Sequence, residues 1–305
     1  MTGVAVLGCG YVGCELGRRL AAVRDHDHDA DRGHEVYGVR RSEDGLDAVR
    51  EAGIEPVQAD VVDRTSLDAV PDADWVIFAA SAGGRDAEAA RETYVNGLRT
   101  AIESFGERAD SPDRFVYTSS TGVYGDFGGK EVDEETPLDP TTERQETLLE
   151  AERLAIEHAA EHGMAGTVVR FGGLYGPGRY RVERYLDGPV TAGHLNLTHR
   201  DDAAGAVAYL LEEDAARSEV VNVVDDEPVS KHDLADWFAE QCSVEKPEKR
   251  TIEERLADDD LSAGAKARIA ADKRCSNAKL RALGYDFAYP TYREGYSEAV
   301  EAYLN

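Results

Sequence analysis

The amino-acid sequence predicts an α/β protein built on a doubly wound parallel sheet, with helices on both faces. Apolar runs recur with helical segments between them, an alternation typical of parallel strands joined by crossover helices. The runs are nearly continuous rather than alternating in polarity, as expected for strands covered on both faces. In chain order they are GVAVLG, HEVYGVR, EPVQAD, DWVIFAAS, RFVYTSS and GTVVRFGG.

The segments between these runs have helical character. YVGCELGRRL follows the first run, RDAEAARETYVNGLRTAIESF carries apolar residues near helical spacing, and DPTTERQETLLEAE reads as a further helix. After residue 171 the pattern loosens, with a strand-like EVVNVVD and helices expected at 231–242, 250–271 and 291–303. We therefore expect a sheet domain over 1–171 and a smaller substrate-binding region over 172–305, interleaved with the sheet.

The charge balance narrows the range of partners and compartments. There are 61 Asp and Glu residues against 34 Lys and Arg residues, a net charge of −27 spread along the whole chain. Such a surface repels nucleic acid and anionic membranes. The same pattern resembles proteins of salt-accumulating archaea, so we expect a haloarchaeal protein. No window approaches 18 apolar residues and no basic leader precedes the first strand, so a cytoplasmic protein is expected.

Metal binding is not expected. The four cysteines, Cys9, Cys14, Cys242 and Cys275, lack the CxxC spacing of metal sites, and we interpret them as reduced structural thiols. The loop 24–33, RDHDHDADRG, contains two histidines among aspartates, but no third ligand is near in sequence. A solvated acidic loop is the preferred interpretation.

A dinucleotide-binding turn follows the first strand. GCGYVG places Gly8, Gly10 and Gly13 in a GxGxxG between a strand and a helix, with Tyr11 and Val12 inside it. In such turns the first glycine allows the tight bend, the second admits the pyrophosphate and the third allows close helix packing. The sheet is therefore expected to be of the Rossmann type.

The end of the second strand predicts which dinucleotide binds. An NAD enzyme normally has an acidic residue there to accept from the ribose hydroxyls. Arg40 and Arg41 stand at this position instead. Two guanidiniums suit a 2′-phosphate, so NADP is favoured, with NAD as the alternative.

The ordered series GCGYVG, QADVVD, RFVYTSSTGVYGD, ETPLDP, VVRFGGLYGPGR, NLTHRDDAAGAV and VVNVVDDEPVS resembles the extended short-chain dehydrogenase/reductases, the NAD-dependent epimerase/dehydratase family, and within it the atypical YeeZ-like branch. The resemblance implies an oxidoreductase or isomerase, a small-molecule substrate such as a nucleotide sugar, and a homodimer as an open expectation. It also implies that Asp60 and Val61 lie near the adenine. Ala79, Ala80 and Ser81 would border the nicotinamide ribose.

One motif of that family is missing here. Ordinary members have a Ser or Thr, matched by Ser120, and a YxxxK on the next helix whose Tyr moves the substrate proton. The Tyr and Lys positions fall on Arg144 and Leu148, and no Tyr or Lys occurs from 131 to 163. The conceivable replacements are Tyr124, one of two helix carboxylates (Glu143 or Glu146), or Arg144 as a fixed cation. A packing role is the alternative for Tyr124.

The resemblance also implies substrate contacts for Arg170, Arg179, Asn196 and His199. Structural roles are the alternative: Arg170 could pair with a carboxylate, and His199 with Asp202 could cap a helix. Two functions therefore stay open. One is an NADP-dependent oxidoreductase or epimerase with an unusual acid/base. The other is a non-catalytic NADP-binding redox sensor or regulatory module.

Overall fold

The computed structural model describes residues 2–22, 33–83 and 87–304. The chain forms two compact units. Unit 1 comprises 1–120, 146–170 and 203–221, and unit 2 comprises 121–145, 171–202 and 222–305. The division therefore differs from the expected 1–171 and 172–305. Residues 121–145 belong to unit 2, whereas 203–221 return to unit 1 and lead into a further strand of its sheet.

The centre of unit 1 is a seven-stranded parallel sheet, which confirms the predicted fold class. The strand order is β12-β7-β5-β4-β1-β2-β3. All six apolar runs form strands, and the strand-like segment after residue 218 adds the seventh. The strands are β1 (Gly3–Leu7), β2 (Glu35–Arg40), β3 (Glu55–Gln58), β4 (Trp75–Phe78), β5 (Arg114–Ser120), β7 (Ala165–Phe171) and β12 (Glu219–Val223).

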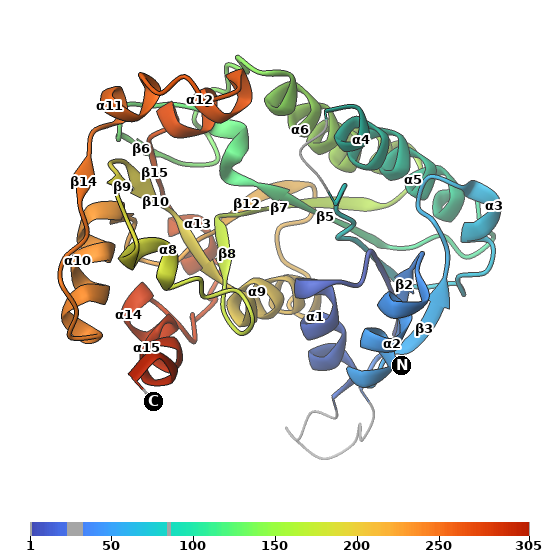
Figure 1. The fold of residues 1–305 in the computed structure, drawn as a ribbon. Helices are drawn as coiled ribbons and strands as arrows, with labels where there is room; N and C mark the ends of the chain where they lie inside the picture. Colours follow the sequence, from blue (N-terminus) through green and yellow to red (C-terminus); the bar gives the residue numbers. More distant parts are fainter. Residues whose placement is uncertain (1, 23–32, 84–86, 305) are drawn as a thin grey trace. The chain divides into compact units, whose positions relative to one another are not determined.

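Helices cover both faces of this sheet (Figure 1). α1 and α9 lie on one face, and α4, α5 and α6 lie on the other. On α5, buried Leu98, Ala101, Ile102 and Phe105 recur at helical spacing and pack against the sheet. The helices are α1 (Tyr11–Ala21), α2 (Glu43–Glu51), α3 (Arg64–Leu67), α4 (Ala87–Arg91), η1 (Glu92–Gly97), α5 (Leu98–Gly106), α6 (Glu143–Arg153), η3 (Leu154–His158), α7 (Ala159–Glu161) and α9 (Arg200–Glu212).

Unit 2 consists of short strands and helices around its own core, which is rich in tyrosine and leucine. The expected helix 250–271 is interrupted, and the expected helix 291–303 also divides in two. Thr251 and Thr291 cap the first helix of each pair with capping boxes, and Ser262 caps the new helix start after the first interruption. The elements are η2 (Thr121–Tyr124), β6 (Glu131–Val132), β8 (Gly173–Tyr175), α8 (Glu183–Leu186), β9 (Val190–Thr191), β10 (His194–Leu195), β11 (Leu197–His199), β13 (Val229–Ser230), α10 (Lys231–Gln241), β14 (Lys249–Arg250), α11 (Ile252–Leu256), α12 (Ala263–Ala270), β15 (Arg274–Cys275), α13 (Ala278–Ala282), α14 (Tyr292–Gly295) and α15 (Ser297–Leu304).

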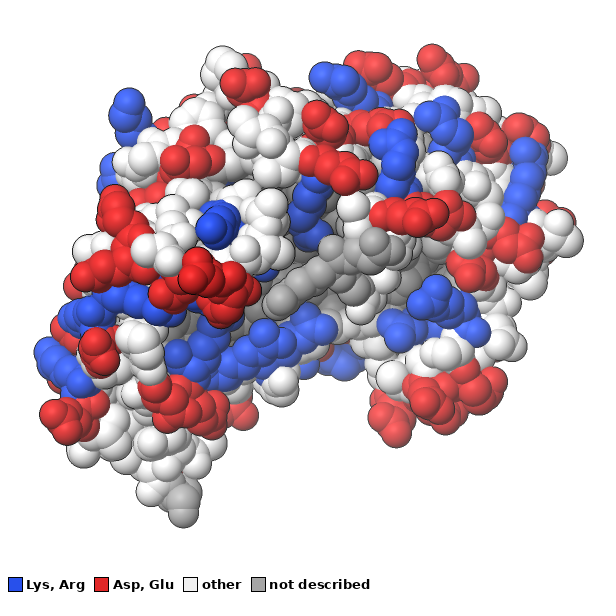
Figure 2. All heavy atoms as spheres, turned by 45° about the horizontal axis from the view of Figure 1, so that its top comes forward, with Lys and Arg blue, Asp and Glu red and all other residues white. Residues whose placement is uncertain are grey.

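Acidic side chains are distributed over the visible face, with Lys and Arg among them (Figure 2). Many arginines are held in ion pairs; Arg217, for example, pairs with both Asp113 and Asp214. Exposed pairs of this kind contribute little stability individually. Their effect here is to offset locally the repulsion among the excess carboxylates.

Candidate functional site

The glycine turn of unit 1 has the backbone that a pyrophosphate site requires. Gly8 has φ +83°, and a Cβ there would lie 2.3 Å from the Cα of Ala80, so only glycine fits. Gly10 is the N-cap of α1, and no described side chain caps that helix or places an acid in its first turn. The start of α1, with its amide dipoles and no acidic side chain, therefore suits an anion.

Arg40 lies against this turn. Its Nη1 donates to the carbonyl oxygen of Cys9 at 3.2 Å, and a Cβ on Gly10 would lie 2.8 Å from the same nitrogen. Arg41 is exposed, and its carbonyl accepts from Gln58 Nε2 at 3.2 Å. The structure thus places one guanidinium beside the anion site and a second one further out at the end of β2.

The other cofactor residues expected from sequence lie at the carboxyl ends of β3 and β4. Asp60 accepts from the amide of Val62 through Oδ1 at 3.3 Å, and Ala79 donates to the carbonyl of Leu7 at 2.8 Å. Val61 is buried, Ala80 is half-buried and Ser81 is exposed. Because the strands are parallel, these residues share one edge of the sheet with the glycine turn, where ligands of open α/β sheets bind.

The two serines at the end of β5 have different roles, as alternation along a strand requires. Ser119 Oγ donates to Glu152 Oε1 at 2.6 Å. Arg170 donates to the same carboxylate from Nε at 3.0 Å and from Nη2 at 2.7 Å, and all three side chains are buried. Arg170 therefore pairs with a carboxylate, as the structural interpretation of the sequence expected, and the structure does not support a contact between Arg170 and a substrate. Ser120 is half-buried, and alternation along the strand predicts that its side chain lies on the other face.

The structure does not support Tyr124 as a base. Its ring is 2% exposed, and its hydroxyl donates to Oδ1 of the buried Asn222 at 2.9 Å. Arg144 is exposed at the start of α6, where it makes no ion pair with any described carboxylate, and Leu148 is buried. The packing role considered for Tyr124 therefore agrees with the geometry. The helix that carries YxxxK in the family has neither a phenol nor an ammonium here.

Of the expected substrate contacts in unit 2, Arg179 is exposed, whereas Asn196 and His199 serve the fold. Asn196 accepts from the amide of Cys275 at 2.6 Å and donates to the carbonyl of Lys273 at 3.1 Å. His199 is 2% exposed, and burial lowers its pKa. A substrate contact is thus not supported for Asn196 or His199, because neighbouring segments already surround them.

Beside His199, unit 2 contains a buried group of polar side chains. The ring centroids of His199 and Tyr175 are 5.2 Å apart. His199 Nε2, the Tyr175 hydroxyl and both carboxylate oxygens of Asp225 have no hydrogen-bond partner among the described residues. Burial raises the pKa of Asp225 to about 8. A protonated Asp225 is therefore favoured, because an ionised carboxylate would be poorly solvated there.

Two lysines of unit 2 have perturbed environments that the sequence motifs did not indicate. Lys273 is buried, and its Nζ donates to the carbonyl of Gly125 at 3.1 Å. Lys231 Nζ donates to the carbonyl of Ala192 at 3.4 Å. Burial lowers the pKa of both lysines, and for Lys231 this effect outweighs the neighbouring Asp272, which raises the pKa. A signal was available, because only seven of the 34 cationic residues are lysines.

These lysines adjoin a hydrogen-bonded histidine–aspartate pair. His194 Nδ1 lies 2.9 Å from Asp272 Oδ1, which also accepts from the His194 amide at 2.7 Å. A Cβ built on Gly193 would lie 3.2 Å from Lys231 Nζ and 3.7 Å from Asp272 Oδ1. Ionisable groups with perturbed pKa values cluster at functional sites, so these lysines are candidates for one.

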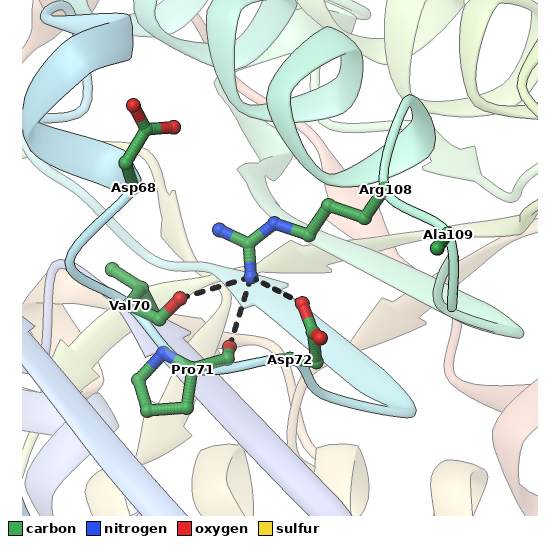
Figure 3. Close-up of a pocket in the computed structure, with 6 residues that line it drawn as sticks. All are labelled: Asp68, Val70, Pro71, Asp72, Arg108 and Ala109. Atoms are coloured by element: carbon green, nitrogen blue, oxygen red, sulfur yellow. Dashed lines mark hydrogen bonds and ion pairs between the residues drawn. The ribbon is translucent and has the colours of Figure 1, made fainter.

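A hollow of about 420 Å³ opens elsewhere on unit 1, lined by Asp68, Val70, Pro71, Asp72, Arg108 and Ala109 (Figure 3). The Arg108 guanidinium projects across it. Its Nη1 donates to the carbonyls of Val70 and Pro71 at 2.9 and 3.0 Å and to Asp72 at 3.2 Å. Because this guanidinium already serves the loop after α3, the hollow has no cation to offer a ligand.

Residues 24–32 of the histidine-containing loop lie outside the described residues. Within 2–22, 33–83 and 87–304, no cluster of three or more His, Cys, Asp or Glu side chains is placed to bind a metal ion. In the same part of the chain, no helix combines the length and apolar character needed to cross a membrane.

Many α/β proteins have a glycine turn of this kind at the edge of the sheet, so the turn alone does not identify the family. The model of the NAD dependent epimerase/dehydratase family matches residues 4–223. The chain belongs to this family. Protein YeeZ of Escherichia coli K12 is 29% identical over 300 residues, covering 95% of this chain and 97% of YeeZ.

Solved structures agree with this assignment. A protein of Methylobacillus flagellatus that carries the same family name is 30% identical, with a TM-score of 0.77 over 100% of this chain and 99% of that one. The human epimerase family protein SDR39U1, solved with NADPH, has a TM-score of 0.75 over 99% of each chain. At 18% identity, the human protein shows the fold alone.

Proposed function

We propose that this member of the family binds NADP(H) and acts as an oxidoreductase or epimerase on a nucleotide sugar or a related carbonyl or alcohol, without the YxxxK base. The observation that carries the proposal is the uncapped start of α1 with the Arg40 guanidinium beside it. Backbone amides at a helix start suit a pyrophosphate, and a guanidinium suits a phosphate monoester. The family name refers to NAD, whereas SDR39U1 was solved with NADPH.

The substrate would be recognised in unit 2 through an anionic group. Lys231 and Lys273 are partly desolvated there, and three arginines, Arg179, Arg181 and Arg184, are exposed on the segment before β9. In a chain with a net charge of −27, such a group of cations favours a phosphate or carboxylate on the substrate. A nucleotide sugar carries a diphosphate and fits this requirement.

The acid/base chemistry would then come from outside the YxxxK helix, and Ser120 is the candidate in unit 1. Lys273 is the strongest candidate in unit 2, because burial lowers its pKa and so makes its ammonium a better proton donor. Tyr124 would have to leave Asn222 to take part. Arg144 can act only as a fixed cation, since a guanidinium does not titrate in proteins.

A non-catalytic binding module is the second candidate. The buried phenol of Tyr124, the exposed Arg144 and the buried Leu148 favour it, because each leaves the usual proton relay unfilled. The module would bind NADP(H) with the same glycine turn and Arg40. Turnover is the property that separates the two candidates.

The test is an activity panel with a matched control. The protein is incubated with NADP⁺ or NADPH and a set of nucleotide sugars and simple carbonyls in molar KCl; nicotinamide absorbance reports net reduction, and proton NMR reports epimerisation or dehydration. We expect Ser120→Ala to abolish turnover and Ser297→Ala, on the exposed side of α15, to retain it. We also expect Lys231→Gln to raise KM for an anionic substrate, whereas Lys266→Gln leaves it unchanged.

Cofactor binding without turnover of any compound would favour the module. Wild-type rates in Ser120→Ala, Arg144→Ala and Lys273→Met together would remove the proposed chemistry. Both candidates would be refuted if the protein, kept in a thiol reductant, bound neither NADP(H) nor NAD(H).

A further inference from the structure

The glycine turn contains two cysteines whose sulfurs are close together. Cys9 Sγ and Cys14 Sγ lie 3.7 Å apart, and the Cys14 thiol donates to the carbonyl oxygen of Cys9 at 3.4 Å. Cys9 is fully buried between Gly8 and Gly10, whereas Cys14 is half-buried on α1. Both are free thiols. We propose that Cys9 and Cys14 form a reversible disulfide that turns dinucleotide binding off.

The pair has the asymmetry that thiol–disulfide exchange requires. Cys14 is the accessible member, near the start of α1, where the amide dipoles favour a thiolate. The hydrogen bond from the Cys9 thiol, and to a lesser extent Arg40, lower the pKa of Cys14 to about 7, whereas the same hydrogen bond and burial raise the pKa of Cys9. Cys14 is therefore the attacking sulfur, and Cys9 is the buried resolving sulfur.

The oxidant is a small-molecule disulfide, R–S–S–R. The Cys14 thiolate attacks one of its sulfurs, forms a mixed disulfide and releases one RS⁻, which takes up a proton. Cys9, on losing its proton, then attacks Cys14 Sγ, forms the Cys9–Cys14 bond and releases the second RSH. The two protein sulfurs lose two electrons in total, and the external disulfide gains them. A dithiol reductant reverses both steps.

We expect closure of the bond to disturb the turn. The sulfurs have to approach by roughly 1.6 Å, since a disulfide is about 2.05 Å long. The turn has no slack at Gly8, where a Cβ would lie 2.3 Å from Ala80 Cα. The Cys9 carbonyl is also the acceptor of the Arg40 guanidinium. Movement of Cys9 therefore shifts both the amides that face the pyrophosphate and the cation proposed for the 2′-phosphate.

The effect on binding rests on the proposed function, whereas disulfide formation does not, so the two are measured separately. The reduced protein is first titrated with NADPH. It is then oxidised with 2-hydroxyethyl disulfide, alkylated and digested with trypsin. No Lys or Arg precedes Arg18 in the sequence, so Cys9 and Cys14 fall in one peptide, apart from Cys242 and Cys275.

We expect that peptide to lose two hydrogens and to resist alkylation. NADPH affinity should fall by about tenfold or more, the equivalent of one lost hydrogen bond to a charged group, and a dithiol should restore it. Cys14→Ser should show neither change, and Cys242→Ala should behave as wild type. By reciprocity, saturating NADPH should raise the reduction potential of the pair by about 30 mV for each tenfold difference in affinity.

Persistent alkylation of both thiols, or a mixed disulfide that stops at Cys14, would overturn the proposal. So would a Cys9–Cys14 bond that leaves NADPH affinity unchanged. If the reduced protein fails to bind NADPH, the proposed function fails instead, and the peptide result still decides whether the disulfide forms.

Discussion

Replacement of Arg40 by alanine is the most direct test of the cofactor assignment. Arg40 Nη1 lies 3.2 Å from the Cys9 carbonyl and next to the Gly10 Cα, within the turn that would hold the pyrophosphate. A hydrogen bond to a charged group contributes about 1.5–3 kcal/mol, so its loss should weaken NADP(H) binding by about 10- to 150-fold. NAD(H) has no 2′-phosphate and should be almost unaffected.

The assay is a fluorescence titration of NADPH and NADH on wild type, Arg40→Ala and Arg41→Ala. Arg64→Ala is the matched control, because Arg64 lies on α3, is 51% exposed and pairs with Glu107. Titrations in dilute buffer and in 1 M KCl distinguish the contributions of Arg40 and Arg41 to binding. At 1 M salt the Debye length is about 3 Å, so the exposed Arg41 should contribute much less there than the half-buried Arg40.

Two results would refute this reasoning. Equal wild-type affinities for the two dinucleotides, or tighter binding of NADH, would exclude a 2′-phosphate clamp. An equal loss for both dinucleotides in Arg40→Ala would mean that the guanidinium only supports the turn through the Cys9 carbonyl.

Three further predictions concern the surface and the buried polar groups. With a net charge of −27, the melting temperature should rise from dilute buffer to molar KCl, because carboxylate repulsion is screened; an unchanged melting temperature would contradict both this and the expected halophilic origin. Burial raises the pKa of Asp225 to about 8, so its contribution to folding stability is present at acid pH and is lost as the pH rises towards 8. Asp225→Asn should remove this pH-dependent loss of stability, whereas the exposed Asp187→Asn should keep it. Parallel stability–pH profiles of wild type and Asp225→Asn would contradict the prediction. Tyr124→Phe should lower stability by about 1–3 kcal/mol, because it leaves Asn222 Oδ1 buried without that donor, whereas Tyr303→Phe, at a 42% exposed ring, should not; equal melts would contradict this.

The sequence was most informative where structure depends on neighbours along the chain. The continuous apolar runs predicted the sheet, and the spacing of Gly8, Gly10 and Gly13 predicted the turn between β1 and α1. The absence of Tyr and Lys from 131 to 163 could be read directly. It also follows from sequence that Arg40 ends the second strand, because the ends of a strand are marked by the local pattern of residues.

The roles of the polar side chains were decided by tertiary structure. Tyr124 meets Asn222 across 98 positions, and Arg170 meets Glu152 across 18. Such partners cannot be inferred from spacing, because burial and pairing depend on which strands and helices pack together. The same holds for Lys273 at the Gly125 carbonyl.

The cysteine pair shows most clearly which features the sequence determines and which features depend on tertiary structure. Sequence alone determined that Cys9 stands inside the glycine turn and Cys14 on the helix that follows, and it favoured inert thiols. The fold decided that their sulfurs lie 3.7 Å apart, with the Cys9 carbonyl held by Arg40 from the next strand. The physical reason is that side-chain distances across a turn depend on its backbone angles and on the packing of β2 against β1, which the residue order of the turn does not specify.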